Sequence, residues 1–425
     1  MGHTPSDRGY ETTPLEAFSC SKEPDRVFWK PPEGEALAGL GSSESIQVDG
    51  PERFEAAAVA SEQLLAPGQF AFAGFAFADS QPPNTIAPES PESPDNASRN
   101  YRLWDGYPSG LLLLPKQVIR GNAAMSHTSQ APSSSSNLTD TDNSTGNFAG
   151  SNSIASLNVQ DTTRDAFQNV VKLAANDIEA NKLSKVVVAR QVDATGTINA
   201  AEVLDRLCAR FDSCAVFGFG RGPLCFLGAS PELLLNLEDN RVTTCAVAGT
   251  APRGATPQED QENAQRLASN AKEQDEHRYV VEYLRTCLAL ADVDLDPVGP
   301  TTVKTLPGVH HLSTQITGRI APQPGLALRL VGALHPTPAV GGTPTTMAQQ
   351  WISQHEQLNR GWYAGPVGWI DHRGCGSFYV ALRSALASPT KLRLFAGAGI
   401  VAGSNPEREL AETDLKLAAI LDVVT

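Results

Sequence analysis

Several short stretches of this chain alternate large apolar residues with small or polar ones, the pattern of strands with one buried face. Residues 70–77 show it most clearly, because Phe alternates there with Ala or Gly. Residues 111–114 are four consecutive leucines, a run that predicts a fully buried strand. Similar patterns predict further strands at 185–192, 215–219, 224–227, 232–237, 242–246, 364–370, 376–384 and 391–395.

Other segments repeat their apolar residues every three or four positions, which is the helical spacing. It predicts helices at 164–181, 200–211, 259–290, 346–358 and 406–421. The strands follow one another as hairpins, as around Arg221-Gly222-Pro223, rather than alternating with helices. This order favours an α/β fold of the α+β kind, with large antiparallel-rich sheets and helices on the outside.

Two segments carry neither pattern. Residues 1–55 are polar and mixed in composition, and no element is assigned to them. Residues 125–157 are rich in Ser, Thr, Asn and Asp. Such a composition cannot bury enough apolar area to offset the entropy lost on ordering, so this segment is predicted to be a flexible insertion.

The composition is that of a globular protein with a large core, since 41% of the 425 residues are hydrophobic. A formal net charge of −14 disfavours nucleic-acid binding, because an acidic surface repels phosphate. No apolar run reaches the ~18 residues of a membrane helix, and no secretory signal is visible. The seven cysteines form no C-x-x-C pair. We therefore expect free thiols and a cytoplasmic protein.

Two of the predicted helices each place a pair of glutamates in line with an apolar stripe. Glu273 and Glu276 form one pair, and Glu409 and Glu412 form the other, followed by Lys416. Carboxylates that face a core are costly unless they are paired or bind a metal. Two such pairs brought together would offer the oxygen ligands that suit Mg²⁺. The alternative is that both pairs lie on solvated faces, which the spacing alone favours.

Three more charged residues stand in apolar surroundings. Lys185 opens a valine-rich strand, where it is either a partly desolvated base or a lysine that extends to solvent. Glu232 lies between apolar runs, and is either a general acid with a raised pKa or an exposed turn residue. Arg383 in an apolar strand is suited to binding a carboxylate, or else forms a structural ion pair.

The glycines at 397 and 399 precede the last helix, where they would let backbone N–H groups approach an anion or would form a tight turn. Residues 404–407, Ser-Asn-Pro-Glu, are predicted to form a capping box at the start of that helix. His310 and His311 have no third ligand nearby in the sequence, so zinc is not expected, and both are interpreted as structural or supporting groups.

Nine segments in collinear order resemble the motifs of the chorismate-utilising enzymes, and most closely those of isochorismate synthases. The similarity extends from about residue 60 to the end, apart from the Ser-rich insertion. The segments are Lys185-Val-Val-Val-Ala-Arg190, Leu227-Gly-Ala-Ser-Pro-Glu232, Ala248-Gly-Thr-Ala-Pro-Arg-Gly254, Lys272-Glu273-x-x-Glu276-His277, Leu334-His-Pro-Thr-Pro-Ala-Val-Gly-Gly342, Tyr363-Ala-Gly-Pro-Val-Gly368, Leu382-Arg-Ser384, Phe395-Ala-Gly-Ala-Gly-Ile-Val401 and Glu409-x-x-Glu412-Thr413-x-x-Lys416.

The resemblance implies one catalytic domain over 56–425, with two large antiparallel-rich sheets packed together, peripheral helices and a site in the cleft between. It also implies Mg²⁺ as cofactor and the dianion chorismate as substrate. Lys185 would be the base that activates water for attack at ring C2. Glu232 would be the acid that protonates the departing C4 hydroxyl.

The resemblance further assigns binding roles. Glu276 and Glu412 would hold Mg²⁺ directly, with Glu273 and Glu409 close behind. The substrate would be bound by residues from several motifs, which are Gly249, Thr250, Ala339, Tyr363, Arg383, Gly397 and Lys416.

The expected activity is therefore that of an isochorismate synthase supplying menaquinone, catechol siderophore or salicylate synthesis. Lys185 favours water as nucleophile, because family members that use ammonia usually have Gln there. Salicylate synthases, which go on to eliminate pyruvate, remain the alternative. Their segment corresponding to 334–342 resembles this one but has Thr where this chain has Ala339. An alternative of another class is a catalytically silent chorismate-binding protein. The sequence is compatible with a monomer and leaves the oligomeric state open.

Overall fold

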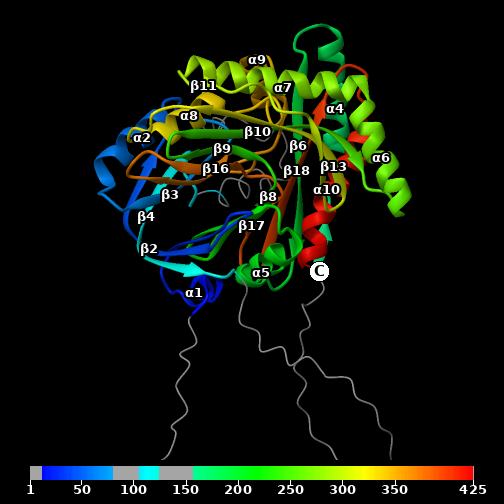
Figure 1. Ribbon diagram of the computed structural model, residues 1–425. Helices are drawn as coiled ribbons and strands as arrows, with labels where there is room; N and C mark the ends of the chain where they lie inside the picture. Colours follow the sequence, from blue (N-terminus) through cyan, green and yellow to red (C-terminus); the bar gives the residue numbers. More distant parts are fainter. Residues whose placement is uncertain (1–11, 80–103, 105, 124–156, 425) are drawn as a thin grey trace, which may run out of the picture.

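The computed structural model describes residues 12–79, 104, 106–123 and 157–424. Within them the helices lie outside a strongly curled sheet (Figure 1). The helices are α1 (Pro14–Cys20), α2 (Arg53–Leu64), α4 (Arg164–Glu179), α5 (Ala200–Arg210), α6 (Pro257–Ser269), α7 (Ala271–Leu290), α8 (Leu326–Leu334), α9 (Thr345–His355) and α10 (Pro406–Val424). No helix in the described ranges is both long and apolar enough to cross a membrane.

The strands form one continuous order of neighbours, and every pairing among the described residues is antiparallel. From one end to the other the order is β12 (Thr302–Leu306), β13 (Val309–Arg319), β10 (Arg241–Pro252), β9 (Leu233–Glu238), β16 (Gly376–Val380), β15 (Pro366–Asp371), β3 (Phe70–Phe75), β4 (Gly110–Gly121), β2 (Ala36–Val48), β1 (Asp25–Lys30), β7 (Ala215–Arg221), β8 (Leu224–Ser230), β17 (Ser384–Ala387), β18 (Lys391–Ile400) and β6 (Lys185–Thr195). Short strands extend the two ends, with β11 (Asp294–Leu295) on β13, and β5 (Asn158–Gln160) and β14 (Gly342–Thr343) on β6. The predicted antiparallel-rich fold with peripheral helices is confirmed, and the strands expected in two packed sheets are joined by pairing into one curled sheet.

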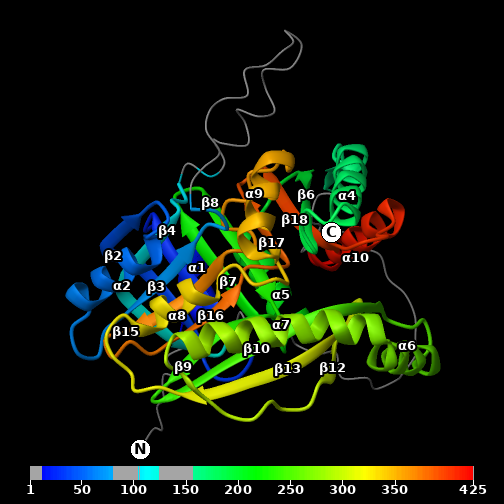
Figure 2. The same cartoon turned by 90° about the horizontal axis from the view of Figure 1, so that it is seen from above.

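The two ends of this strand order carry the helices that matter for the site. α7 packs on β10 and β13, whereas α10 packs on β18 and on α4. Figure 2 shows α7 running along β10 and β13, and α4 and α10 together beside β6 and β18. Residues of both groups line one cavity. The curl of the sheet therefore brings strands that are far apart in the order to a common pocket.

Four segments differ from the sequence predictions. Residues 12–55, to which no element was assigned, contain α1, β1, β2 and the start of α2. The strand β1 is central, because it pairs with both β2 and β7, and its Phe28 and Trp29 are buried. Its apolar run is only three residues long, too short for the pattern to indicate a strand. The stretch 291–342 likewise contains β11 to β14 and α8 despite its many Pro and Gly residues.

The helix predicted over 259–290 is two helices, α6 and α7, separated at Asn270. The Asn270 side chain accepts hydrogen bonds from the backbone N–H groups of Lys272 and Glu273, so it begins a new helix. The strand predicted over 376–384 is also divided, into β16 and β17. Arg383 has a φ of +46° there, which ends the extended backbone. The insertion predicted at 125–157 lies outside the described residues, except for Leu157.

Candidate active site

A cavity of about 210 Å³ lies between the two ends of the strand order, and all thirteen site residues predicted from the sequence line it. They come from β6, β10, β18, α7, α10 and four connecting segments. The residues are Lys185, Glu232, Gly249, Thr250, Glu273, Glu276, Ala339, Tyr363, Arg383, Gly397, Glu409, Glu412 and Lys416. Motifs separated by more than 200 positions in the sequence therefore meet at one place.

Lys185 begins β6, and its side chain points into the cavity with only 11% of its surface exposed. Its Nζ lies 2.5 Å from Glu276 Oε1 on α7, so a short ion pair joins the two ends of the strand order. Gly399 on the adjacent β18 leaves room for this lysine, because a Cβ at that position would lie 2.9 Å from Lys185 Cε. Of the two alternatives that the sequence left open, the structure shows a lysine that is buried in the cavity rather than one that extends to solvent.

Glu232 occupies the bend between β8 and β9 and is 6% exposed. Its backbone N–H donates to Ser230 Oγ, which itself donates to the Val380 carbonyl, so the bend is fixed on two sides. Burial raises the pKa of Glu232 to about 7, against the opposing effect of Lys185, Lys304 and Lys416. A carboxyl with that pKa can hold a proton near neutral pH and donate it.

Arg383 is buried, and its guanidinium has no carboxylate partner among the residues that the structure describes. Its polar contact is with the Cys214 thiol at 3.9 Å, and it lies over the Phe211 ring. Burial lowers the pKa of Arg383, because the Cys214 thiol offsets only part of the cost of removing its charge from water. Both Arg383 and the pocket residue Ala364 adopt the left-handed backbone conformation, with φ of +46° and +62°. Such strain is concentrated at functional sites, and an anion in the cavity would supply the missing partner.

Lys416 reaches the cavity from α10. Its Nζ donates to the Gly397 carbonyl at 2.8 Å and pairs with Glu412 at 2.7 Å. A Cβ on Gly397 would lie 3.2 Å from the Tyr363 hydroxyl, so the glycine keeps this wall open. The Tyr363 ring stacks on Phe395 with centroids 5.3 Å apart, which gives the cavity a flat apolar side.

The four glutamates of α7 and α10 all face the cavity. Burial, and then the neighbouring Glu276, raise the pKa of Glu273, while burial and Glu412 raise the pKa of Glu409 to about 7. Burial opposes ionisation of Glu412, but Lys416, His311 and Lys185 together outweigh it and lower that pKa. The carboxylates therefore crowd one another, and two of the four are neutralised by lysines.

This donor set fits a magnesium ion in its chemistry, because carboxylate oxygens are the ligands that Mg²⁺ binds. Within the described part of the chain, however, no three His, Cys, Asp or Glu side chains are already gathered as a metal site. Lys185 and Lys416 supply the positive charge beside Glu276 and Glu412 instead. A divalent cation would replace that charge.

Another wall of the cavity is made by β10 and β13, the strands on which α7 packs. A β-bulge leaves Gly249 outside the strand register with a φ of +75°, and a Cβ there would lie 3.0 Å from Glu273 Oε2. His311 lies across from Thr250, with Nδ1 3.0 Å from the Gly249 carbonyl and 3.2 Å from Thr250 Oγ1. Burial, with Lys416 and Arg383, lowers the pKa of His311 to about 3, so this imidazole is neutral.

Sequence reasoning missed several cavity residues. His311 was expected to be structural or supporting, but it lines the cavity directly. Its register opposite Thr250 could have indicated this only if the strand β13 had been predicted. Arg360 also lines the cavity and is held by Glu356 and by the carbonyls of Val187 and Val340. Its position three residues before Tyr363 was the available signal.

The start of α10 differs in detail from the predicted capping box. The Asn405 side chain, not that of Ser404, accepts from the backbone N–H groups of Glu407 and Arg408. Ser404 Oγ instead accepts from the Val401 N–H, in the turn before the helix. Asn at this position satisfies the free N–H groups at the start of α10 as well as Ser would.

Comparison with known proteins gives a consistent result. A family model described as chorismate binding enzyme matches residues 9–425. The salicylate biosynthesis isochorismate synthase of Pseudomonas aeruginosa is 43% identical over 263 residues, which cover 62% of this chain and 55% of that protein. Isochorismate synthase DhbC of Bacillus subtilis is 38% identical over 265 residues, covering 60% of this chain and 66% of that protein. The chain thus matches between about half and two thirds of the length of these relatives.

A solved structure titled as a putative 2,3-dihydroxybenzoate-specific isochorismate synthase, DhbC from Bacillus anthracis, superposes with a TM-score of 0.74. The superposition covers 97% of this chain and 99% of that one at 24% sequence identity. At that identity the match establishes the shared fold, including the N-terminal strands that the sequence patterns did not reveal.

Proposed function

Because this chain belongs to the chorismate-binding enzyme family, we propose that it converts chorismate to isochorismate in a magnesium-dependent reaction. One observation supports this most directly. A single cavity contains a buried lysine side chain, a buried carboxyl with a pKa of about 7, and a buried guanidinium without a carboxylate partner among the described residues. These are a base, an acid and an anion-binding group for one small substrate.

Chorismate carries two carboxylates, and the cavity offers positive charge in two places. Arg383 and Lys416 would bind the carboxylate of the enolpyruvyl group. The other carboxylate, on the ring, would lie on the side of the glutamates of α7 and α10, which would hold the Mg²⁺. The stacked Tyr363 and Phe395 rings offer an apolar side to the substrate. Local positive charge thus allows an acidic protein to bind a dianion.

The proposed chemistry exchanges one water for another. Lys185, as the free amine, accepts a proton from a water molecule whose oxygen forms a bond to ring C2. The ring double bonds shift, and the C4–O bond breaks. Glu232 donates its proton to the departing hydroxyl, which leaves as water. Atoms and charge balance, because one water enters and one leaves, and the proton on Lys185 returns to Glu232 through solvent.

Glu276 and Glu412, supported by Glu273 and Glu409, would hold the Mg²⁺. When bound, the ion would neutralise the ring carboxylate and keep it oriented. The lysines that now pair with these glutamates would then lose their carboxylate partners. Lys185 would be free to contact water and Lys416 to contact the substrate.

The test is a product assay with chorismate and Mg²⁺ on the purified protein. We expect isochorismate without pyruvate, no turnover after removal of the metal with a chelator, and loss of turnover in Lys185→Ala. Glu276→Gln should weaken Mg²⁺ binding and activity together. Release of pyruvate and salicylate would instead identify a salicylate synthase. Binding of chorismate without any product would indicate a catalytically silent binding protein, and unchanged turnover in Lys185→Ala would refute the mechanism.

A further inference from the structure

Two residues of the sequence motifs have no role in the reaction above, and the structure joins them. Arg190 ends the motif that Lys185 begins, and Thr413 follows Glu412 in the last motif. Arg190 Nε donates to Thr413 Oγ1 at 2.7 Å. We propose that Arg190 is a positioning residue, which sets the rotation of α10 and thereby places Glu409 and Glu412 for the metal. This inference rests on the proposed function, because it concerns the same magnesium site.

The geometry of Arg190 supports such a role. It lies five positions after Lys185 on a strand without a bulge, so the two side chains leave β6 on opposite faces. Lys185 lines the cavity, whereas Arg190 turns towards α10 with 1% of its side chain exposed. Its Nη1 donates to Asp161 at 2.7 Å, and its Nη2 pairs with Asp414 of α10. A buried guanidinium with three acceptors has a single favourable position.

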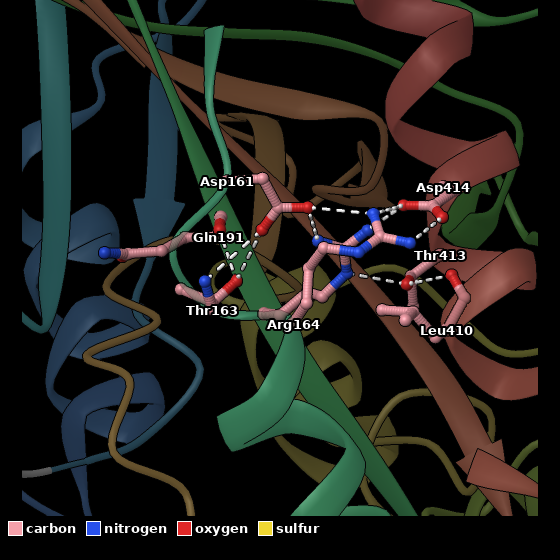
Figure 3. A network of polar contacts seen from close by, with 8 residues as sticks. Asp161, Thr163, Arg164, Gln191, Leu410, Thr413 and Asp414 are labelled. Carbon is pink, nitrogen blue, oxygen red and sulfur yellow. Dashed lines mark hydrogen bonds and ion pairs between the residues drawn. The ribbon is translucent and has the colours of Figure 1, made fainter. Parts of the chain in front are cut away.

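The acceptors are themselves held, as Figure 3 shows. Arg164, at the start of α4, binds both carboxylate oxygens of Asp414 at 3.0 and 2.9 Å and also pairs with Asp161. Thr163 Oγ1 donates to the Gln191 carbonyl on β6 at 2.9 Å. The network therefore joins β6, the start of α4 and the middle of α10. Two positive and two negative charges balance within it.

The hydrogen bond between Arg190 and Thr413 is the contact that a rotation of α10 would break. Thr413 is fully buried, and its hydroxyl donates to the Leu410 carbonyl one turn earlier while accepting from Arg190. The outer radius of a helix is about 5–6 Å, so a 20° rotation would move a side-chain tip by about 2 Å. Metal–oxygen distances tolerate about 0.2 Å. Fixing the Thr413 face therefore fixes the neighbouring Glu409 and Glu412 face to the precision that a metal site needs.

The test compares Mg²⁺ affinity, measured by isothermal titration calorimetry on the full chain, in matched variants. Arg190→Met should weaken Mg²⁺ binding by about tenfold or more, the usual effect of removing a group that orients metal ligands. Thr413→Val, which removes only the hydroxyl, should weaken it in the same direction, and Thr413→Ser should restore it. Thermal unfolding of each variant shows how much stability each loses.

Arg393→Met is the matched control. Arg393 is also buried, on β18, and forms a bidentate ion pair with Asp193 of β6 at 2.7 and 2.8 Å. Its loss should lower stability without changing Mg²⁺ affinity. Equal Mg²⁺ affinity in Arg190→Met and Arg393→Met would overturn the inference, as would Thr413→Val with unchanged affinity. If the unmodified protein binds no Mg²⁺, the proposed function itself fails, which is a different result.

Discussion

At the scale of single residues, the cavity depends on ionisable groups that burial has placed in unusual states. Glu232 and Arg383 were both recognisable in the sequence as charges within apolar runs. Their partners were not recognisable, because they come from segments far away in the chain. The short contact between Lys185 and Glu276 joins positions 91 residues apart, and no local pattern could predict it. The sequence could therefore indicate which charged residues belong to the site, whereas the groups that surround them could be identified only in the folded structure.

The first prediction concerns Glu232. The carboxyl must be protonated to act as an acid, and burial raises its pKa to about 7. We therefore expect the pH profile of kcat/KM for chorismate to bend downward as pH rises through about 7, since the protonated fraction of Glu232 decreases there while the free-amine fraction of Lys185, which the mechanism also needs, still increases. The groups that face Glu232 and bear on this limb are Lys185, Lys304, Lys416, Cys245 and Tyr363. A pH profile of kcat/KM measures it.

Glu232→Gln, which cannot supply a proton, should lower kcat by about 10²–10⁴-fold. Glu238→Gln is the control, because that glutamate is exposed at the end of β9 and has no part in the site. A kcat/KM that still rises steadily between pH 7 and 9 would contradict the assignment of Glu232 as the acid.

At the scale of elements, both helices that carry the glutamate pairs begin at an asparagine cap. Asn270 caps α7 and Asn405 caps α10. The spacing placed each glutamate pair in line with an apolar stripe, but by itself it favoured solvated faces, whereas in the structure all four glutamates line the cavity. The break at Asn270 was missed, because the polar and apolar pattern continues across it from α6 to α7. A helix cap is made by a single side chain, so the periodicity of apolar residues does not reveal it.

The second prediction follows from these caps. Asn270→Ala and Asn405→Ala should each reduce the free energy of unfolding by about 1 kcal/mol, the usual cost of losing an N-cap. Each should also weaken Mg²⁺ binding, because the first turn of α7 carries Glu273 and the first turn of α10 carries Glu409. Urea unfolding and calorimetry measure the two effects.

Asn199→Ala provides the comparison. Asn199 caps α5 by accepting from the N–H groups of Ala201 and Glu202, but α5 contributes nothing to the cavity. We expect the same loss of stability with unchanged Mg²⁺ affinity. A similar loss of affinity in all three variants would mean that the effect is general destabilisation and not positioning.

At the scale of the whole molecule, the sheet is a single order of strands whose two ends meet at the cavity. Hairpins such as β7–β8 and β15–β16 were predictable, because neighbouring strands in the sequence pair locally. The pairing of β1 with β7 and of β6 with β18 was not, since it joins strands about 190 and 200 residues apart. The class of fold could thus be predicted from the sequence, whereas the closure that makes the site could not.

The third prediction is that the protein contains no disulfide. All seven cysteines are free, and Cys214, Cys225 and Cys375 are buried. Burial raises the pKa of Cys208 and of Cys225 to about 12, so these thiols should be unreactive in the folded protein. A thiol reagent should modify the exposed Cys20 first and all seven after unfolding without reductant. Fewer than seven in the unfolded protein would reveal a disulfide, and a melting temperature that depends on reductant would do the same.

The strand β18 and the helix α10 complete the cavity but come late in the sequence, which has a consequence for biosynthesis. During translation, most strands of the curled sheet are made before Gly397, Glu409, Glu412 and Lys416 leave the ribosome. A nascent chain can therefore bury much of its apolar surface while its pocket still lacks half of the predicted metal ligands. The complete pocket would therefore form only when α10 docks, and under the proposed function a partly synthesised chain would not act on chorismate.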